Sequence, residues 1–229
     1  REAPRTAVAF HLCEGVLAGD AGTAAEAAVD AADEASMIGA AEKARSVAAR
    51  ALEVLHDADE QRPDLECRAQ LVIGETLAVM QLDYPAARVA VLAAADIAQT
   101  HRWPELAGRA ALAYGRLFVP GAIDPVDARL VRAALDLGGS GDWRLPLLAT
   151  EAGAMLLEGD WDGGAAALDE AVAAAESAGP GARASTLLTR AAMYWGWPDD
   201  TVTAVAAREG LAAAEEVGST FSLVSARIS

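Results

Sequence analysis

The sequence predicts an all-α fold built from consecutive helical hairpins, and three observations support this prediction. Alanine fills 58 of the 229 positions, and it has the highest helix propensity because it loses no side-chain rotamers in a helix. The runs of β-branched and aromatic residues that favour strands are absent from the sequence. Apolar residues recur at the 3.6-residue helical period, in segments that come in pairs.

The pairs define five hairpins in chain order, at 24–55, 65–100, 103–137, 143–178 and 182–217. The first hairpin turns at Gly39 and the second turns at Leu-Asp-Tyr. The third has the longer connection Val-Pro-Gly-Ala-Ile-Asp-Pro, the fourth turns within Glu-Gly-Asp-Trp-Asp-Gly-Gly and the fifth turns at Trp-Pro-Asp. Glycine, proline and aspartate are the residues that turns require. A further helix is predicted at about 4–18, and 221–229 resembles the start of a sixth pair.

The turn EGDWDGG, at 158–164, has the spacing of the first ligands of a calcium loop. Such a loop needs an oxygen ligand at its fifth position and a glutamate at its twelfth. Here those positions hold Gly164 and Ala171, which disfavours a metal site. We expect Gly159 to end one helix in the left-handed conformation, Asp160 to cap the next helix and Trp161 to pack over the corner.

The hairpins form an internal repeat of about 40 residues. Small residues align at one position of each second helix, at Ala51, Ala94, Ala133, Ala171 and Ala212. A hairpin of this kind cannot bury its apolar face alone, so neighbouring hairpins must stack into one continuous core. We therefore expect residues 1–229 to form one right-handed α-α superhelix, with an irregular helical bundle as the alternative.

The formal charge of −16, with Lys43 as the only lysine, argues against direct binding to nucleic acid, because such binding requires basic neutralisation of phosphates. The charge fits either solubility or a basic partner. Two cysteines, Cys13 and Cys67, indicate no disulfide framework and favour reduced thiols in the cytoplasm. No signal peptide or membrane span is predicted. The start at Arg1, without methionine, suggests a piece of a larger protein.

No residue pattern predicts a catalytic site, a cofactor site or a metal site, so we expect a protein that is not an enzyme. The strongest opposing pattern is Asp30, Asp33 and Glu34, which share one helical face and suggest an all-α metal-dependent enzyme as an alternative. The glycine-rich segment 135–143 lacks the lysine that a phosphate-binding loop requires.

The first helix of each hairpin should line the concave groove of the superhelix. We expect this groove to receive a protein partner or a small-molecule effector, because aromatic and arginine side chains dominate recognition surfaces. The candidate groove residues are Asp33, Glu75, Arg116 and Arg190, with Tyr114 and Trp195 nearby.

Small residues also connect the chain to a known repeat. Within the first hairpin, they occupy the positions at which tetratricopeptide hairpins pack their helices closely, at Ala32, Ala35, Ala44, Ala48 and Ala51. Larger side chains there would push the helix axes apart.

Several segments resemble the helical-repeat region of large ATP-binding LuxR-family transcriptional regulators of actinobacteria. The likeness rests on 72–121, 147–179 and the sequence YWGWPDD followed by a helix ending in LAAAEEVGS. The resemblance implies a sensor region between a nucleotide-binding module and a helix-turn-helix, in a regulator of the kind that often controls secondary metabolism. It also implies effector binding or self-association through the repeats. A free-standing scaffold protein is the alternative.

Overall fold

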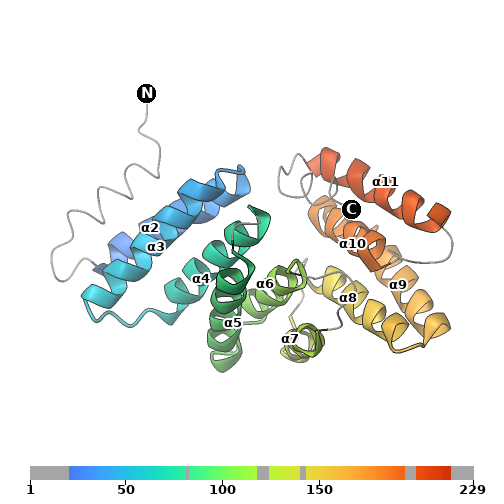
Figure 1. The fold of residues 1–229 in the computed structure, drawn as a ribbon, viewed down its shortest axis with the longest axis horizontal. Helices are drawn as coiled ribbons and strands as arrows, with labels where there is room; N and C mark the ends of the chain where they lie inside the picture. The colour runs from blue at the N-terminus through green and yellow to red at the C-terminus, as the bar shows by residue number, and fades with distance from the viewer. Residues whose placement is uncertain (1–20, 81–82, 118–123, 140–142, 194–199, 218–229) are drawn as a thin grey trace. The chain divides into compact units, whose positions relative to one another are not determined.

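The computed structural model describes residues 21–80, 83–117, 124–139, 143–193 and 200–217. Every regular element within these ranges is an α-helix, which confirms the predicted all-α class (Figure 1). The helices are α2 (Ala21–Met37), α3 (Ala41–Asp57), α4 (Pro63–Val79), α5 (Tyr84–Thr100), α6 (Pro104–Gly115), α7 (Pro125–Asp136), α8 (Arg144–Leu157), α9 (Trp161–Ala175), α10 (Pro180–Met193) and α11 (Asp200–Val217). The expected helix at 4–18 and the segment 221–229 lie outside the described residues.

The outer bounds of the predicted hairpins lie within about three residues of the ends of these helices. Proline in the first turn begins α4, α5, α6 and α7, because its fixed φ suits a helix start and its missing N–H has no partner to lose there. Asp83 and Asp124 accept hydrogen bonds from the first-turn N–H groups of α5 and α7. These local signals explain why the sequence locates the helices.

The chain divides into two compact units, unit 1 (Arg1–Phe118) and unit 2 (Val119–Ser229). In unit 1, α2 packs against α3 and α4 packs against α5, while α4 also contacts α2 and α6. In unit 2, α8 packs against α9 and α10 packs against α11, with α7 against α8. The two helices of the predicted hairpin 103–137 belong to different units, so their pairing stays a prediction.

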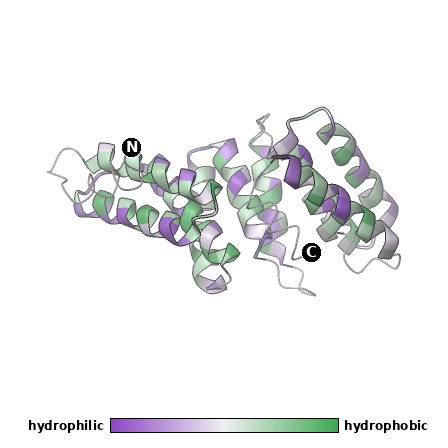
Figure 2. Ribbon diagram, turned by 90° about the horizontal axis from the view of Figure 1, so that it is seen from above, coloured by the Kyte–Doolittle hydropathy of each residue, from purple (hydrophilic) through white to green (hydrophobic). Residues whose placement is uncertain are grey.

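Small residues form the helix interfaces of the first hairpin, as predicted. Ala32, Ala35, Ala44, Ala48 and Ala51 are all buried, and they belong to one apolar cluster. Figure 2 shows hydrophobic and hydrophilic segments alternating along the helices, as expected for helices with one packed side. None of the described helices is long and apolar enough to cross a membrane.

The predicted alignment of the second helices is wrong in two hairpins. Ala51, Ala94 and Ala171 are buried as expected, but Ala133 is only half-buried and Ala212 is exposed. Their neighbours are buried instead, at Ala134, Ala213 and Ala214. One residue turns a helix by about 100°, so alignment on small residues alone does not determine which member of an alanine run faces the core.

The EGDWDGG segment is a turn between α8 and α9, as predicted. Gly159 has a φ of +94°, and Asp160 accepts a hydrogen bond from the N–H of Gly163 at 3.0 Å. Trp161 begins α9 and remains 53% exposed, so it covers the corner less completely than expected. The first hairpin also turns at a glycine in the left-handed region, Gly39 with a φ of +78°, but Ala40 gives α3 no side-chain cap.

Candidate functional site

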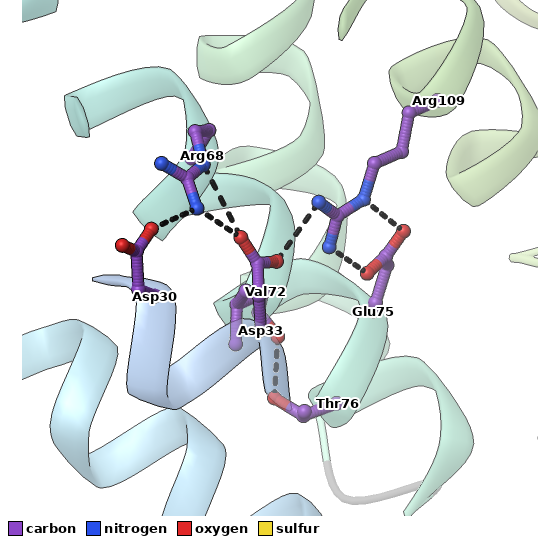
Figure 3. Close-up of polar contacts among 7 residues, drawn as sticks. All are labelled: Asp30, Asp33, Arg68, Val72, Glu75, Thr76 and Arg109. Carbon is purple, nitrogen blue, oxygen red and sulfur yellow. Dashed lines mark hydrogen bonds and ion pairs between the residues drawn. The ribbon is translucent and has the colours of Figure 1, made fainter. Parts of the chain in front are cut away.

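Five charged residues meet on one face of unit 1. Asp30 and Asp33 come from α2, Arg68 and Glu75 come from α4, and Arg109 comes from α6. Figure 3 shows Asp33 between the two arginines, with a carboxylate oxygen directed to each. We call these five residues the charged face.

Helical periodicity explains how each helix contributes to the charged face. Asp30 and Asp33 are three positions apart, which places both carboxylates on the same side of α2. Arg68 and Glu75 are seven positions apart, which is close to two turns of α4. Because α4 packs against both α2 and α6, its two charged residues lie between the other two helices.

Arg68 connects α2 to α4. Its Nη2 donates to Asp30 Oδ1 at 2.7 Å and to Asp33 Oδ2 at 2.7 Å. Its Nε also donates to Asp33 Oδ2, at 3.2 Å. Desolvation opposes the charge of Arg68, but the hydrogen bonds that Arg68 donates to Asp30 and Asp33, together with their negative charge, outweigh it and raise the pKa of the guanidinium.

Arg109 connects α6 to both other helices. Its Nε and Nη2 donate to the two carboxylate oxygens of Glu75, at 3.0 and 2.7 Å, and its Nη1 donates to Asp33 Oδ1 at 2.9 Å. A planar guanidinium suits such paired contacts because its donors have a fixed fork geometry. Desolvation disfavours the charge of Arg109, but attraction to Glu75 and Asp33 is stronger in sum and raises its pKa.

The charged face is accessible to solvent at its centre. The side chain of Asp33 is 21% exposed, that of Arg109 is 31% exposed and that of Glu75 is 11% exposed. Partial exposure leaves the ion pairs open to water and to screening by salt. The arrangement is therefore suited to recognition of a polar or charged group at a surface.

Asp33 and Glu75 are the predicted groove residues that the structure brings together. Each of them contacts Arg109, although they are 42 positions apart in the sequence. Arg116, a third predicted residue, follows the end of α6 and is exposed. Glu75 and Arg109 are the charged groups that act on the Arg116 guanidinium, so Arg116 belongs to the electrostatic surroundings of the charged face.

The other predicted groove residues lie elsewhere. Tyr114 is buried, with 3% of its surface exposed, and does not line an open surface. Its hydroxyl accepts a hydrogen bond from Arg88, whose guanidinium carbon lies 5.1 Å from the centre of the tyrosine ring. Arg190 belongs to unit 2, where it donates to Glu209 and joins α10 to α11. Trp195 lies outside the described residues.

Sequence reasoning did not identify Arg68 and Arg109. The signal that points to them is the repeat itself, because they are 41 positions apart and Glu75 and Arg116 are also 41 positions apart. Charged residues that recur at the repeat interval on first helices lie on corresponding faces of successive hairpins. A search for repeated charges, in addition to repeated alanines, would have identified them.

Asp30 and Asp33, two of the acidic residues considered for metal binding, pair with arginines in this structure. Asp30 pairs with Arg68, and both oxygens of Asp33 accept hydrogen bonds from arginines. In the described part of the chain, no three His, Cys, Asp or Glu side chains are grouped to hold a metal ion. Guanidinium groups this close would repel a cation at Asp33.

No protein-family model matches the sequence, and no curated protein matches it at a significant level.

Proposed function

We propose that this chain is a regulatory interaction domain. It binds a protein partner or a small-molecule effector on the side formed by the first helices of its hairpins, here called the first-helix side. In this proposal the hairpins form a right-handed, tetratricopeptide-like superhelix of about five repeats. Four packed helix pairs among the described residues support it, together with buried small residues at the interface of the first hairpin. A repeat array of this kind offers an extended surface for binding.

The charged face is the observation that carries the proposal. Its residues come from three successive first helices, the helices that would line the concave side of a superhelix. Asp30 adds a carboxylate that is 62% exposed beside the partly exposed Asp33. Charged groups at such a surface favour specificity and fast association more than they favour raw affinity.

In this proposal, supported by the resemblance of the sequence to LuxR-family regulators, the domain belongs to a transcriptional activator of the cytoplasm. Occupancy of the first-helix side, or self-association through the repeats, would then shift a neighbouring nucleotide-binding module between inactive and active states. A ligand has this effect only when its affinity differs between the two states. DNA binding would belong to another module, in keeping with the acidic charge of this chain.

A thermal-shift screen of effectors and candidate partner peptides tests the binding role, because a ligand that binds only the folded state raises Tm. Two matched variants locate the binding. Asp30→Asn removes one carboxylate from the charged face, and Glu53→Gln removes one from the Arg50–Glu53 pair on α3. We expect a ligand's Tm shift to decrease in Asp30→Asn and to persist in Glu53→Gln. Equal responses of the two variants would contradict the proposed site.

A second measurement tests whether DNA binding belongs to another module and not to this chain. Fluorescence anisotropy with promoter DNA that the full regulator binds, at physiological salt, should give no specific binding to the 229-residue chain. Binding as tight as that of the full regulator would contradict the proposed role.

A further inference from the structure

Asp33 and Arg109 each have a second partner within the charged face. Asp33 Oδ2 accepts two hydrogen bonds from Arg68, and only its Oδ1 accepts from Arg109. Arg109 holds both oxygens of Glu75 through two of its nitrogens, and its Nη1 donates to Asp33. When the Asp33–Arg109 hydrogen bond breaks, neither charge loses its counter-charge.

The three links between the helices therefore differ in strength. Three hydrogen bonds through Arg68 join α2 to α4, and a bidentate pair between Glu75 and Arg109 joins α4 to α6. A single hydrogen bond, Asp33 Oδ1 to Arg109 Nη1, joins α2 directly to α6. Leaving a buried charge unpaired is the main cost of breaking an ion pair, and this break avoids it.

The Asp33–Arg109 bond joins two helices that do not belong to adjacent hairpins. α4 contacts both α2 and α6, so it is the shared element of the three first helices. In most repeat proteins each repeat contacts only its neighbours. The direct bond from Asp33 on α2 to Arg109 on α6 therefore spans the hairpin of α4 and α5 between them.

We propose that the Asp33–Arg109 hydrogen bond is a reversible latch that sets the curvature of unit 1. When the latch opens, α6 moves away from α2 with α4 as the hinge, while Arg68 and Glu75 keep their pairs. The opening separates the two sides of the charged face and frees one oxygen of Asp33 and one donor nitrogen of Arg109. This inference depends on the contacts alone and holds whichever partner the domain binds.

Salt should control the latch, because both of its side chains are partly exposed. Raising the salt concentration from 0.01 M to 1 M shortens the Debye length from roughly 30 Å to about 3 Å. The Glu75–Arg109 pair is more resistant, because it is bidentate and Glu75 is less exposed. We therefore expect the α2–α6 link to open before the α4–α6 link.

Double electron–electron resonance on the 229-residue chain measures this motion. Spin labels at Met37→Cys, the exposed last residue of α2, and at Glu105→Cys, an exposed residue of α6, report the distance between the helices. Cys13→Ser removes one native thiol. Cys67 stays unlabelled, because it is buried and desolvation raises its pKa to about 11. We expect one distance population at low salt and a second, longer one at 1 M salt.

Arg109→Lys tests the latch at constant charge, because lysine provides a point charge without the fork that reaches both carboxylates. This variant should show the longer population already at low salt. The control is Arg50→Lys, the same change in an ion pair within α3, which should match the parent. The proposal is overturned if the distance between the spin labels is unchanged both in the parent at 1 M salt and in Arg109→Lys at low salt. It is also overturned if Arg50→Lys lengthens this distance as much as Arg109→Lys does. If circular dichroism shows that Arg109→Lys is unfolded, a salt-independent distance in the parent overturns it.

Discussion

Asp33 and Arg109 are 76 positions apart in the chain, yet Asp33 Oδ1 accepts a hydrogen bond from Arg109 Nη1 at 2.9 Å. The same guanidinium binds Glu75 through its two other nitrogens. One side chain of α6 thus connects helices from two preceding hairpins. This arrangement makes Arg109 the residue on which the charged face depends most.

Arg109→Ala should destabilise unit 1, because it leaves Glu75 without its bidentate arginine and leaves Asp33 with Arg68 as its remaining arginine partner in the charged face. Breaking a fully buried ion pair by removing one partner costs about 3–5 kcal/mol. Partial exposure of Arg109 reduces this cost, so we expect a loss of about 1–3 kcal/mol in the free energy of unfolding. Urea unfolding followed by circular dichroism measures it.

Arg50→Ala is the matched control for this measurement. Arg50 pairs with Glu53 at 2.9 Å within α3, and the carboxylate of that pair is exposed. Exposed ion pairs contribute only about 0.2–1 kcal/mol. A loss in Arg109→Ala no larger than that in Arg50→Ala would show that the charged face contributes little to stability.

The helices could be predicted from the sequence because their signals are local. Alanine-rich periodicity marks each helix, and Gly39, Asp83 and Asp160 mark turns whose chemistry depends on neighbouring residues. The face of each helix that is buried in the core was harder to predict. It depends on the rotation of each helix about its own axis, and an alanine run such as Ala133–Ala134 leaves that rotation undetermined.

The charged face could be predicted only in part. Counting positions along the first helices predicts Asp33 and Glu75 as groove residues. Their contacts depend on Arg109 of a third helix, and no local sequence signal marks Arg109. Tyr114 was expected near the groove, yet its ring packs beneath Arg88 of the neighbouring helix α5. Side-chain direction changes by about 100° per residue, so a small error in register moves an expected groove residue into the core.

Gly74→Ala should destabilise unit 1, because α4 and α5 approach closely at this residue. A Cβ on Gly74 would lie 2.5 Å from Val91 Cγ2 and 3.2 Å from the carbonyl oxygen of Ala87. Overpacking of this kind costs about 1–3 kcal/mol, whereas the higher helix propensity of alanine returns at most about 1 kcal/mol. Urea unfolding should therefore show a net loss of stability.

Gly22→Ala provides the control for Gly74→Ala in the same unit. A Cβ on Gly22 would meet the ends of the Arg62 and Glu60 side chains at 3.4 Å, which is ordinary contact. We expect this variant to be neutral or slightly more stable than the wild type. The prediction for Gly74 is wrong if both variants change stability in the same direction and by the same amount.

Asp160→Ala should destabilise the α8–α9 hairpin, because Asp160 caps α9 by accepting a hydrogen bond from the N–H of Gly163 at 3.0 Å. Loss of such a cap typically costs about 1 kcal/mol. The control is Asp162→Ala, which removes an exposed carboxylate from the first turn of the same helix and leaves the cap in place. Its cost should stay below about 0.5 kcal/mol. Equal losses in chemical unfolding would mean that the cap does not stabilise the hairpin.

Asp127→Asn should stabilise the protein at neutral pH. Desolvation raises the pKa of Asp127 from its ordinary 3.8 to about 6, and the charge of Asp124 adds to the rise. In the described part of the chain, its buried Oδ1 has no hydrogen-bond partner. Each pKa unit corresponds to about 1.4 kcal/mol, and partial exposure reduces the sum, so we expect a gain of about 1–2 kcal/mol.

The sign of the pH dependence follows from the raised pKa. The folded protein holds the Asp127 proton more tightly than the unfolded chain, so this group favours folding most below pH 3.8 and loses that contribution as the pH rises through about 6. The stability difference between Asp127→Asn and the wild type should therefore increase from pH 4 to pH 7. Urea unfolding across this range measures it, with the exposed Asp169→Asn in the same unit as the control. The prediction is wrong if the difference does not grow with pH, or if Asp169→Asn reproduces the gain.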